Sequence, residues 1–574
     1  MTSPSTMLQI RNLSIHGSGR TLVRDLSLTV PRGHTLALLG ESGSGKSLSA
    51  LAIMGLLPSG LSLGSASRVF FAGDALPLHD DAAMRAFRGR RLAIIFQDPM
   101  ACLNPFMRVG SQIEEALTRL GVRASAERKS RVLELLREVE LPEPSTLARR
   151  YPHELSGGQQ QRIMIAMALA GEPDLLIADE PTSALDATVQ AEIVKLLADL
   201  QRRRQMAMLF ITHDLAVAAA LAHDVAIMRA GELVECGQAS SVLSTPKHSY
   251  TERLVSARRQ LLAHRPKSAW SGPDSGRPPL SRKEPALQKG PGAHLDSVKS
   301  QCSPITPVLQ ALPSKGDPLV VLKRVSIDYP ARNFFGAPFR AVKDATFDLR
   351  AGRTLGILGE SGSGKSTIAA SVAGLRRPCS GRINVLGCEL TPKRWQLPPA
   401  LRRRCQLIFQ NPYGALNPRL TIERLMSEPL RLANTAPAAC RERVADVLSE
   451  VGLDASFLAR YPHQLSGGQR QRICIARALL CRPDLLICDE VVSALDMTVQ
   501  VQILALLKRL QQEHGFGMLF VGHDIDVVRW IADDILVMHQ GAIVDRLGVD
   551  DLFDPARHEF TRRLVAARPG RRAA

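Results

Sequence analysis

The chain has 574 residues, of which 45% are hydrophobic, 22% charged and 4% aromatic. This composition is typical of folded globular proteins and excludes a chain that is disordered throughout or collagen-like. The length predicts roughly three to five structural units. The formal net charge of +18 favours acidic partners, namely nucleotides, nucleic acid or an anionic membrane surface.

The N-terminal part of the chain gives no sign of export or membrane insertion. Residues Met1–Gln9 have neither the basic start nor the apolar stretch of a secretory signal. The uncharged window Ser47–Ser67 is long enough to be tested as a membrane span, but it contains Gly55 and Pro58 and directly follows a phosphate-binding motif. We therefore expect a helix and a loop of a folded domain there.

Short apolar runs alternate with amphipathic stretches along the chain, which predicts an α/β fold. The runs Thr35–Gly40, Asp174–Asp179 and Met208–Thr212 have the length and character of buried parallel strands. Ala126–Val139 and Val189–Leu200 have helical patterns and lie between or beside these runs.

The ten cysteines include no CxxC pair, which predicts reduced thiols in a cytosolic compartment. Cys474, Cys481 and Cys488 are evenly spaced, but the repeat described next places unrelated residues at the matching positions. We interpret the three cysteines as packing residues rather than a metal site.

The chain repeats itself. Gly40–Ser47, with the sequence GESGSGKS, recurs unchanged as Gly359–Ser366, and Tyr151–Arg162 recurs with few changes as Tyr461–Arg472. Self-similarity of this kind predicts duplicated structural units.

The repeat predicts two homologous domains, residues 7–257 and 319–567. Between them, residues 258–318 are rich in Pro, Ser, Gly and basic residues, with little apolar periodicity. We interpret this stretch as a flexible basic linker, with a small extra domain as the alternative.

Each repeated glycine-rich motif matches the phosphate loop GxxxxGK[ST], in which backbone N–H groups and a helix N-terminus surround phosphate oxygens. Lys46 and Lys365 should reach the β- and γ-phosphates, and the hydroxyls of Ser47 and Ser366 should ligate Mg²⁺. Two such motifs, each after a strand and before a helix, predict binding of nucleoside triphosphate. The nucleotide-binding loop residues are Gly40, Glu41, Ser42, Gly43, Ser44, Gly45, Lys46 and Ser47, then Gly359, Glu360, Ser361, Gly362, Ser363, Gly364, Lys365, Ser366 and Thr367.

An acidic pair ends a buried apolar run in each copy. Asp179 and Asp489 are suited to a Mg²⁺ shell at the end of a strand. The adjacent carboxylates, Glu180 and Glu490, can polarise a water molecule for in-line attack on the γ-phosphate. Downstream of a phosphate loop, this pair predicts hydrolysis.

A third motif, Leu-Ser-Gly-Gly-Gln, opens a helix in each copy and presents another anion-binding N-terminus. Because each domain already has a phosphate loop, the economical interpretation is that this motif serves the partner domain's nucleotide. With these motifs in order the chain resembles ATP-binding-cassette (ABC) ATPases. Each half also has the family's glutamine after a strand (Gln97, Gln410) and its lone histidine (His213, His523).

The resemblance implies a P-loop NTPase fold in each half, with a RecA-like core, a small β subdomain and a helical subdomain. It also implies an intramolecular head-to-tail dimer that encloses two ATP molecules. One composite site would combine Lys46, Ser47, Gln97, Asp179, Glu180 and His213 with Ser466 and Gly468, and the other Lys365, Ser366, Gln410, Asp489, Glu490 and His523 with Ser156 and Gly158.

The resemblance assigns a role to each group. The two glutamates act as catalytic residues, and the two histidines hold the γ-phosphate. The two glutamines sense Mg²⁺ and the attacking water. The implied cofactors are ATP and Mg²⁺, and the implied metal ligands are Ser47, Gln97, Asp179, Ser366, Gln410 and Asp489.

Two departures from the family pattern concern the nucleotide base and the surroundings of the acidic pair. Family members usually place an aromatic residue against the adenine; Tyr329 fits that place, whereas the first copy has Gly17, with His16 as a possible substitute. Val491-Val492 follows the second acidic pair, where the first copy has Pro-Thr. A further departure puts Gly522 at the position of a threonine in the first copy. No catalytic group is lost, so we expect two hydrolytic sites.

Several segments resemble the oligopeptide, dipeptide and nickel import group within this family. These are Phe96–Pro105 and Phe409–Pro418, and the two tails Pro246–Val255 and Pro555–Val565. The resemblance implies an ATPase that powers import of short peptides, glutathione-like compounds included; nickel or another small solute is the alternative.

The same resemblance implies the partners and the location. The helical subdomains, roughly residues 98–152 and 411–462, should receive two transmembrane permease subunits, and an extracytoplasmic solute-binding protein should deliver the solute. The chain would lie at the cytoplasmic face of the bacterial inner membrane, as a peripheral protein.

The rival from another class is a soluble tandem ATPase that acts on ribosomes, which the net charge of +18 would suit. Such proteins usually join their halves through a long charged helix, which the Pro- and Gly-broken linker cannot form. A DNA-repair ATPase would need zinc-type cysteine pairs, and an iron–sulfur cluster in the linker is not expected from Cys302 alone. We expect no nucleic-acid partner.

Overall fold

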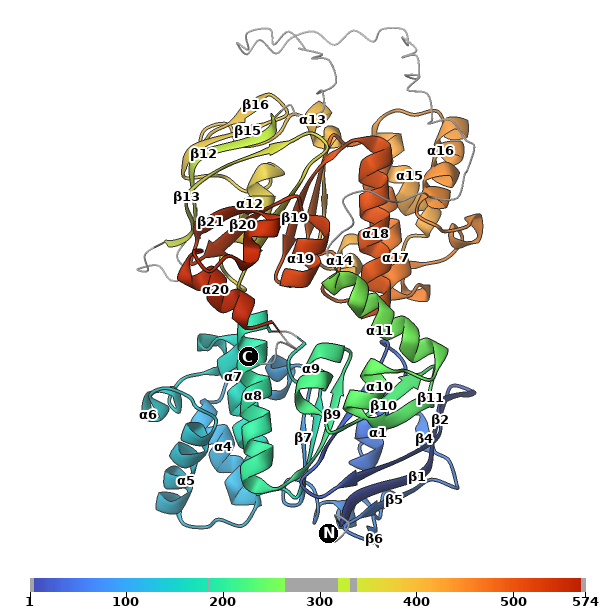
Figure 1. The fold of residues 1–574 in the computed structure, drawn as a ribbon, viewed down its shortest axis with the longest axis vertical. Helices are drawn as coiled ribbons and strands as arrows, with labels where there is room; N and C mark the ends of the chain where they lie inside the picture. The colour runs from blue at the N-terminus through green and yellow to red at the C-terminus, as the bar shows by residue number, and fades with distance from the viewer. Residues whose placement is uncertain (1–4, 184, 264–317, 331–337, 569–574) are drawn as a thin grey trace.

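The computed structural model describes residues 5–183, 185–263, 318–330 and 338–568 (Figure 1). Two α/β domains of like architecture follow one another along the chain, as the repeat predicts. Each has a mainly parallel sheet, a smaller antiparallel sheet and a group of helices on one side (Figure 1). The predicted fold class is confirmed.

The main sheet of the first domain has the strand order β11-β10-β3-β9-β8-β7. Its strands pair in parallel except β11, which runs antiparallel to β10. The three central strands are apolar runs that are buried along their whole length, as expected for a sheet covered on both faces. The strands are β3 (Thr35–Gly40), β7 (Leu92–Ile95), β8 (Leu175–Asp179), β9 (Ala207–Thr212), β10 (Asp224–Arg229) and β11 (Glu232–Gln238).

The smaller sheet of the first domain is antiparallel and has the order β2-β1-β5-β6, with β4 paired to β1. Its core-facing side chains and the helix that follows the phosphate loop form one apolar cluster with the main sheet. The strands are β1 (Thr6–Gly17), β2 (Arg20–Pro31), β4 (Leu61–Leu63), β5 (Arg68–Phe71) and β6 (Asp74–Ala75).

The helices of the first domain cover the main sheet and build a separate helical part from α3 to α6. That part packs through a continuous apolar cluster on helix α7, which begins at the Leu-Ser-Gly-Gly-Gln motif. The helices are α1 (Lys46–Ile53), α2 (Asp81–Met84), α3 (Pro99–Cys102), α4 (Val109–Arg119), α5 (Ser125–Glu138), α6 (Pro144–Leu147), α7 (Gly157–Leu169), α8 (Ala187–Arg204), α9 (Leu215–Leu221), α10 (Ala239–Ser244) and α11 (Ser249–Leu262).

The second domain repeats this plan with the main-sheet order β17-β18-β19-β14-β20-β21 and the small-sheet order β13-β12-β15-β16. Its strands are β12 (Pro318–Tyr329), β13 (Phe339–Arg350), β14 (Thr354–Gly359), β15 (Ser380–Val385), β16 (Cys388–Leu390), β17 (Cys405–Ile408), β18 (Leu485–Asp489), β19 (Gly517–Gly522), β20 (Asp534–His539) and β21 (Ala542–Gly548). Its helices are α12 (Lys365–Val372), α13 (Pro399–Arg404), α14 (Pro412–Ala415), α15 (Ile422–Leu432), α16 (Pro437–Glu450), α17 (Gly467–Leu479), α18 (Met497–His514), α19 (Ile525–Ile531) and α20 (Glu559–Ala566).

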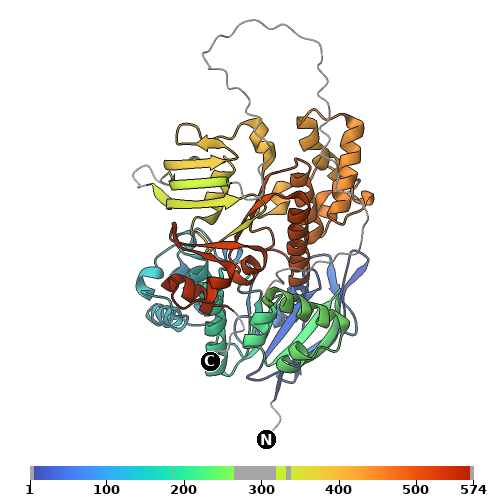
Figure 2. The same cartoon turned by 45° about the horizontal axis from the view of Figure 1, so that its top comes forward.

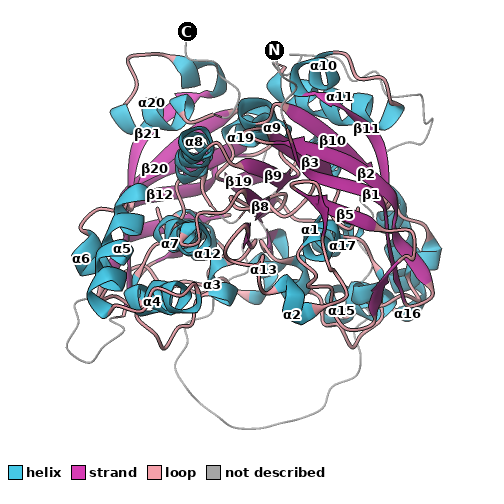
Figure 3. Cartoon of the chain, turned by 90° about the horizontal axis from the view of Figure 1, so that it is seen from below, coloured by secondary structure: helices cyan, strands magenta, loops and turns pink. Residues whose placement is uncertain are grey.

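The two domains lie head to tail. In the views of Figures 1 and 3, the helical part of one domain lies on the same side of the molecule as the small sheet of the other. Figure 2 shows the same pairing, with the tail helix α11 of the first domain beneath α18 of the second.

Helix α11 ties the two domains together. Its residues Ala257 and Leu261 belong to the apolar core of the second domain, and Arg529 Nη1 donates a hydrogen bond to Leu262 O at 3.4 Å. The predicted linker, 258–318, therefore begins inside a packed helix. Residues 264–317, with Cys302, lie outside the described residues.

The described residues include neither a helix suited to span a membrane nor a cluster of metal-ligating side chains. No helix in this part of the chain combines the length and apolar character of a membrane span. The uncharged window Ser47–Ser67 begins with residues 47–53 of the short helix α1. No group of three or more His, Cys, Asp or Glu side chains within the described ranges is arranged to hold a metal ion.

Candidate active sites at the domain interface

The functional motifs of each domain converge because they follow neighbouring strands of the main sheet. The phosphate loop follows β3, the acidic pair ends β8, and His213 comes directly after β9, which lies between those two strands. Gln97 follows β7 at the edge next to β8. Since these strands are parallel, their carboxyl ends meet at one edge of the sheet. The second domain repeats this arrangement around β14.

The lysine of each phosphate loop is hydrogen-bonded to carbonyl oxygens of the same loop. Lys46 Nζ donates hydrogen bonds to Gly40 O at 2.8 Å and to Glu41 O at 2.9 Å. Burial lowers the pKa of Lys46, against the raising effect of Glu180 and Asp179. Lys365 makes the same contacts in the second domain and has a lowered pKa for the same reason.

The last glycine of each loop is required by its backbone. Gly45 and Gly364 have φ angles of 97° and 100°, a left-handed conformation that favours glycine. A Cβ at Gly45 would lie 2.6 Å from Val23 Cγ2. The buried hydroxyls of Ser44 and Ser363 have no hydrogen-bond partner, as expected for a loop built around a polar ligand.

The hydroxyl of Ser47 and the carboxylate of Asp179 lie together, with Oγ donating to Oδ1 at 3.0 Å. Ser366 and Asp489 make the same contact at 2.9 Å. Burial raises the pKa of both aspartates, and the serine hydrogen bond opposes that rise. An adjacent hydroxyl and carboxylate are the oxygen donors that Mg²⁺ prefers, so the residues present fit this ion.

The glutamate of each acidic pair is held in a strained conformation. Glu180 has φ 45° and Glu490 φ 48°, in the left-handed region that a non-glycine residue rarely adopts. Both main-chain N–H groups bond to the neighbouring strand, Glu180 N to Ile211 O at 3.0 Å and Glu490 N to Val521 O at 3.0 Å. Such strain clusters at functional sites.

The carboxylate of Glu180 contacts the two remaining predicted site residues of its domain. Gln97 Nε2 donates to Glu180 Oε2 at 3.1 Å, and His213 Nδ1 lies 3.2 Å from the same oxygen. In the second domain the corresponding distances, to Glu490 Oε2, are 2.8 Å from Gln410 and 3.4 Å from His523. The predicted metal ligands Gln97 and Gln410 thus contact Glu180 and Glu490 in this structure, rather than the serine–aspartate pairs.

The pKa values show how strongly this contact acts. Burial favours the neutral form of both groups, but the hydrogen bond and charge of the partner outweigh it, so the pKa of Glu180 is lowered and that of His213 is raised. The pair Glu490 and His523 behaves in the same way. A carboxylate that stays ionised is suited to accept a proton from water.

Glu180→Gln is expected to bring the pKa of His213 below its ordinary value of 6.5, because burial then outweighs the attraction of Asp214. NMR titration of the histidines in the nucleotide-free chain measures this, with His523 as the control that should not move. The pair has a raised histidine pKa and a lowered glutamate pKa. Its contribution to stability is therefore complete between the ordinary values, 4.5 and 6.5, and falls as the pH rises through the pKa of folded His213. An unchanged His213 titration would contradict the account.

The Leu-Ser-Gly-Gly-Gln motifs form helix N-termini, as predicted. Ser156 Oγ accepts from Gln159 N at 3.3 Å at the start of α7, and Ser466 Oγ accepts from Gln469 N at 3.3 Å at the start of α17. A Cβ at Gly468 would lie 2.4 Å from Val499 Cγ1, so only glycine lets this helix pack on α18. Both serines are exposed.

The turn after each acidic pair faces the phosphate loop of the other domain. The negative charge of Asp496 opposes the lowering that burial imposes on the pKa of Lys46, and the charge of Asp186 acts in the same way on the pKa of Lys365. Sequence alone does not predict this approach, because each aspartate lies far from its lysine in the chain. The Leu-Ser-Gly-Gly-Gln motif of the second domain, called its signature below, lies beside the turn of the same domain, since a Cβ at Gly467 would lie 3.4 Å from Leu495 Cδ2.

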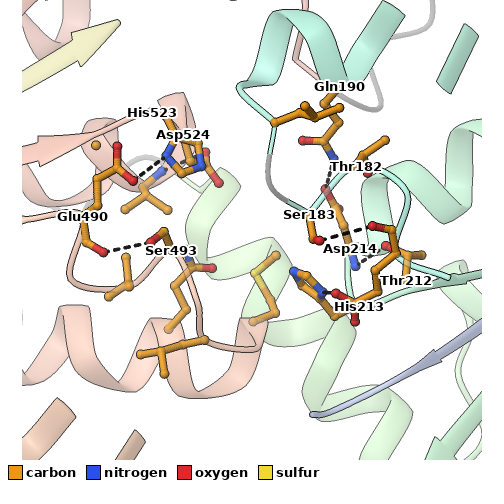
Figure 4. Close-up of a pocket in the computed structure, with 18 of the residues that line it drawn as sticks. Thr182, Ser183, Gln190, Thr212, His213, Asp214, Glu490, Ser493, His523 and Asp524 are labelled. Carbon is orange, nitrogen blue, oxygen red and sulfur yellow. Dashed lines mark hydrogen bonds and ion pairs between the residues drawn. The ribbon is translucent and has the colours of Figure 1, made fainter. Parts of the chain in front are cut away.

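A cavity of about 110 Å³ lies between the domains and is lined by residues of both candidate active sites (Figure 4). Ser183 Oγ donates to Glu180 O at 3.2 Å, and Ser493 Oγ donates to Glu490 O at 3.0 Å. The lining of the cavity includes Glu180, Ser183, His213 and Asp214 from the first domain and Glu490, Ser493, His523 and Asp524 from the second.

The predicted departures near the second acidic pair are changes in packing. Val491 and Val492 are buried in the core, and Leu495 N still bonds to Val492 O at 3.2 Å, as Leu185 N bonds to Thr182 O. Gly522 leaves room for Val528, because a Cβ there would lie 2.8 Å from Val528 Cγ2.

The first domain fills the same space differently. Thr212 accepts a hydrogen bond from Asp214 N at 3.0 Å, and Ala218 stands at the position of Val528. Gly522→Thr alone is expected to destabilise the second domain by about 1–3 kcal/mol through overpacking. The double variant Gly522→Thr/Val528→Ala should recover most of this loss. Thermal unfolding measures both, and a single variant as stable as the natural chain would contradict the packing account.

Comparisons with known proteins agree with this geometry. The family model described as "ABC transporter" matches residues 23–183 and 342–493. The chain is 39% identical to the glutathione import ATP-binding protein GsiA of Pectobacterium atrosepticum, over 99% of this chain and 90% of that protein. It is 40% identical to the peptidoglycan transport ATP-binding protein YejF of Agrobacterium fabrum, over 99% and 97% of the two chains.

A third relative is an uncharacterized ABC transporter ATP-binding protein, YejF of Escherichia coli, with 42% identity over 98% of this chain and 99% of that protein. The likeness spans both domains and extends across whole chains. The protein therefore belongs to the ABC transporter family and carries two ABC ATPase domains in tandem.

Proposed function

We propose that this chain is the ATP-hydrolysing subunit of a bacterial importer for short peptides, including glutathione-like compounds. The observation that carries this proposal is the end-to-end likeness to relatives named for glutathione import and peptidoglycan transport. Those solutes share peptide character. Import of nickel or another small solute is the alternative.

The two catalytic centres would act on ATP bound between the domains. Lys46 would leave the carbonyl oxygens of its loop for the phosphates, and the free hydroxyl of Ser44 would meet a phosphate oxygen. Glu180, kept ionised by His213, would accept the proton of the attacking water. His213, released from Glu180, would then donate to the γ-phosphate.

Mg²⁺, when bound, would neutralise charge on the β- and γ-phosphates. Ser47 with Asp179, and Ser366 with Asp489, would hold the ion. Gln97 would sense that the ion is bound. Its amide bonds to Glu180 in this structure, and the residue lies just before the first helix of the helical part.

The helical parts present apolar side chains that a partner can cover. Phe106 is 89% exposed and Met100 50% exposed in the first domain, and Leu432 is 80% exposed in the second. A contact with a partner would remove these apolar side chains from water, which is favourable. We assign these surfaces to two transmembrane permease subunits, which would hold the chain at the inner face of the membrane, with an extracytoplasmic binding protein that delivers the solute.

Uptake in cells that lack the chain tests the proposal. Cells complemented with the natural chain should accumulate labelled dipeptide or glutathione, and cells with Glu180→Gln/Glu490→Gln should not. A matched variant, Glu389→Gln, changes an exposed carboxylate of the small sheet and should restore uptake. Uptake of nickel without uptake of peptide would favour the alternative, and uptake that does not depend on the chain would refute the proposal.

A further inference from the structure

The two tails, Pro246–Val255 and Pro555–Val565, are each tied to the last strand of a main sheet. In the first domain, Glu235 on β11 accepts a hydrogen bond from His248 N at 3.1 Å. His248 Nδ1 in turn accepts from Tyr250 N at 3.1 Å, at the start of α11. These bonds fix where the helix begins and therefore where the aromatic ring of Tyr250 lies.

The second tail is built in the same way. Asp545 on β21 accepts a hydrogen bond from His558 N at 3.1 Å, and His558 Nδ1 accepts from Phe560 N at 3.1 Å at the start of α20. The two tails thus share a histidine that is followed, two residues later, by an aromatic residue. In both domains this pattern fixes the position of one ring.

In the second domain the ring is joined to the phosphate loop through a histidine. Phe560 stacks on His539 at the end of β20, with the ring centroids 4.0 Å apart. His539 Nδ1 lies 3.9 Å from Glu360 Oε2, in the residue that directly follows the first glycine of the loop. The main-chain oxygen of Glu360 accepts a hydrogen bond from Lys365 Nζ at 2.7 Å. A series of contacts therefore runs from the tail ring to the lysine of the loop.

The first domain has an arginine in place of this histidine. The guanidinium of Arg229 lies 5.1 Å from the ring centroid of Tyr250. Met228 pairs with Gly40 in the sheet, so the residues that follow them, Arg229 and Glu41, lie at the same edge of neighbouring strands. Burial, and after it the charge of Glu41, raises the pKa of Tyr250, which agrees with a ring that reaches the loop.

The ring of Tyr250 also packs beneath both phosphate-binding segments of its domain. It is 2% exposed and belongs to one apolar cluster with Leu39, which directly precedes Gly40, and with Leu215, two residues after His213. The ring of the second tail is likewise part of the apolar core of its domain. One rigid side chain therefore supports both the start of the phosphate loop and the segment after the histidine.

We propose that Tyr250 and Phe560 are positioning residues of the two nucleotide sites. Each ring orders the phosphate loop of its own domain before phosphate binds, so that less conformational entropy is lost on binding and affinity is higher. The ring is the part that acts, because Phe560 has no hydroxyl. The inference rests on the proposed function, in which both loops bind MgATP, and it gives the two tails a role in nucleotide binding.

Single-site forms of the full chain test this role. Lys365→Ala leaves the site of Lys46, and Lys46→Ala leaves the site of Lys365; titration calorimetry measures MgATP and magnesium tripolyphosphate on each. In the Lys365→Ala chain, Tyr250→Leu should weaken both ligands about fivefold, because the ring supports the loop and not the base. In the Lys46→Ala chain Tyr250→Leu should have no effect, and Phe560→Leu should weaken both ligands instead.

Three further variants of the Lys365→Ala chain separate positioning from stability. Tyr250→Phe keeps the ring and should restore both affinities. Arg229→Gln, at an exposed position, removes the cation beside the ring and should also weaken both ligands. Leu254→Ala is the matched control, since Leu254 lies on the same helix and in the same apolar cluster. It should lower the temperature of thermal unfolding and leave both affinities unchanged.

Three results would each overturn the inference. These are unchanged affinities after Tyr250→Leu, equal weakening by Tyr250→Leu and Leu254→Ala, and weakening of MgATP without weakening of tripolyphosphate. Failure of both single-site chains with natural tails to bind MgATP would instead contradict the proposed function.

Discussion

Replacing both glutamates that we expect to act as general bases, Glu180→Gln/Glu490→Gln, is expected to lower ATP turnover by at least about 100-fold. Glutamine keeps the shape of the side chain and an oxygen for Gln97 and Gln410, but it cannot take a proton from water. General-base groups contribute about 10²–10⁴-fold to rate. Because Glu180 and Glu490 have the same backbone conformation and the same histidine contact, each single variant should at least halve turnover.

Steady-state phosphate release measures these rates, with Glu389→Gln as a control on an exposed carboxylate. MgATP binding should be retained in all variants, which separates a chemical defect from a binding defect. A single variant with unchanged turnover would show that its site does not hydrolyse ATP. That outcome would contradict the prediction of two hydrolytic sites.

The second large effect concerns the signature serines, which we expect to act across the interface. Ser466→Arg in a Glu490→Gln chain should lower the remaining turnover at least tenfold. In that chain only the site of Lys46 and Glu180 can fire. Asp496 follows the turn that lies beside the second Leu-Ser-Gly-Gly-Gln motif. Its negative charge opposes the lowering of the pKa of Lys46, which places this part of the second domain near the site of Lys46. An arginine at position 466 would block the helix N-terminus that we expect to donate hydrogen bonds to the phosphates of this site. Donor contacts of this kind account for about 10²–10³ in rate.

The matched variant is Ser156→Arg in the same Glu490→Gln chain, and it should leave turnover nearly unchanged. In a Glu180→Gln chain the two serines should exchange roles. Both serines cap a helix through the same hydrogen bond, so loss of the cap costs each about 1 kcal/mol and cannot produce the difference. Loss of turnover from Ser156→Arg but not from Ser466→Arg would show that each signature serves its own domain.

The sequence predicts the local sites because local backbone geometry requires particular residues there. Gly45 and Gly364 adopt left-handed conformations that few other residues adopt, and Gly468 leaves no room for a Cβ beside Val499. Such requirements leave a motif that is readable in a single chain. The buried strands that align these motifs are likewise visible as continuous apolar runs.

The contacts between domains were harder to predict, because they follow from the placement of surfaces rather than from a motif. Nothing in the tail Pro246–Val255 shows that the helix continues to Leu262 and buries Leu261 in the other domain. The effect of Asp496 on Lys46 likewise joins residues far apart in the chain.

The contact of Leu61 with Gly17 depends on an extra strand that has no sequence signal of its own. The sequence predicts a helix and a loop in the window Ser47–Ser67, whereas the structure has the short strand β4 within it, stabilised by pairing with β1. Strand propensity depends on such neighbours more than on the strand's own residues. His16, which the sequence offers as a substitute for the aromatic residue, has its Nδ1 3.2 Å from Thr21 Oγ1 on the neighbouring strand.

Affinity purification of this chain from membranes solubilised in mild detergent, followed by mass spectrometry, tests the central claim most directly. The account predicts two polytopic permease subunits in nearly equal amount, held by the exposed apolar side chains of the helical parts. Replacing Phe106 and Leu432 by serine should reduce their recovery. Ribosomal proteins without permeases would contradict the importer and favour a soluble tandem ATPase.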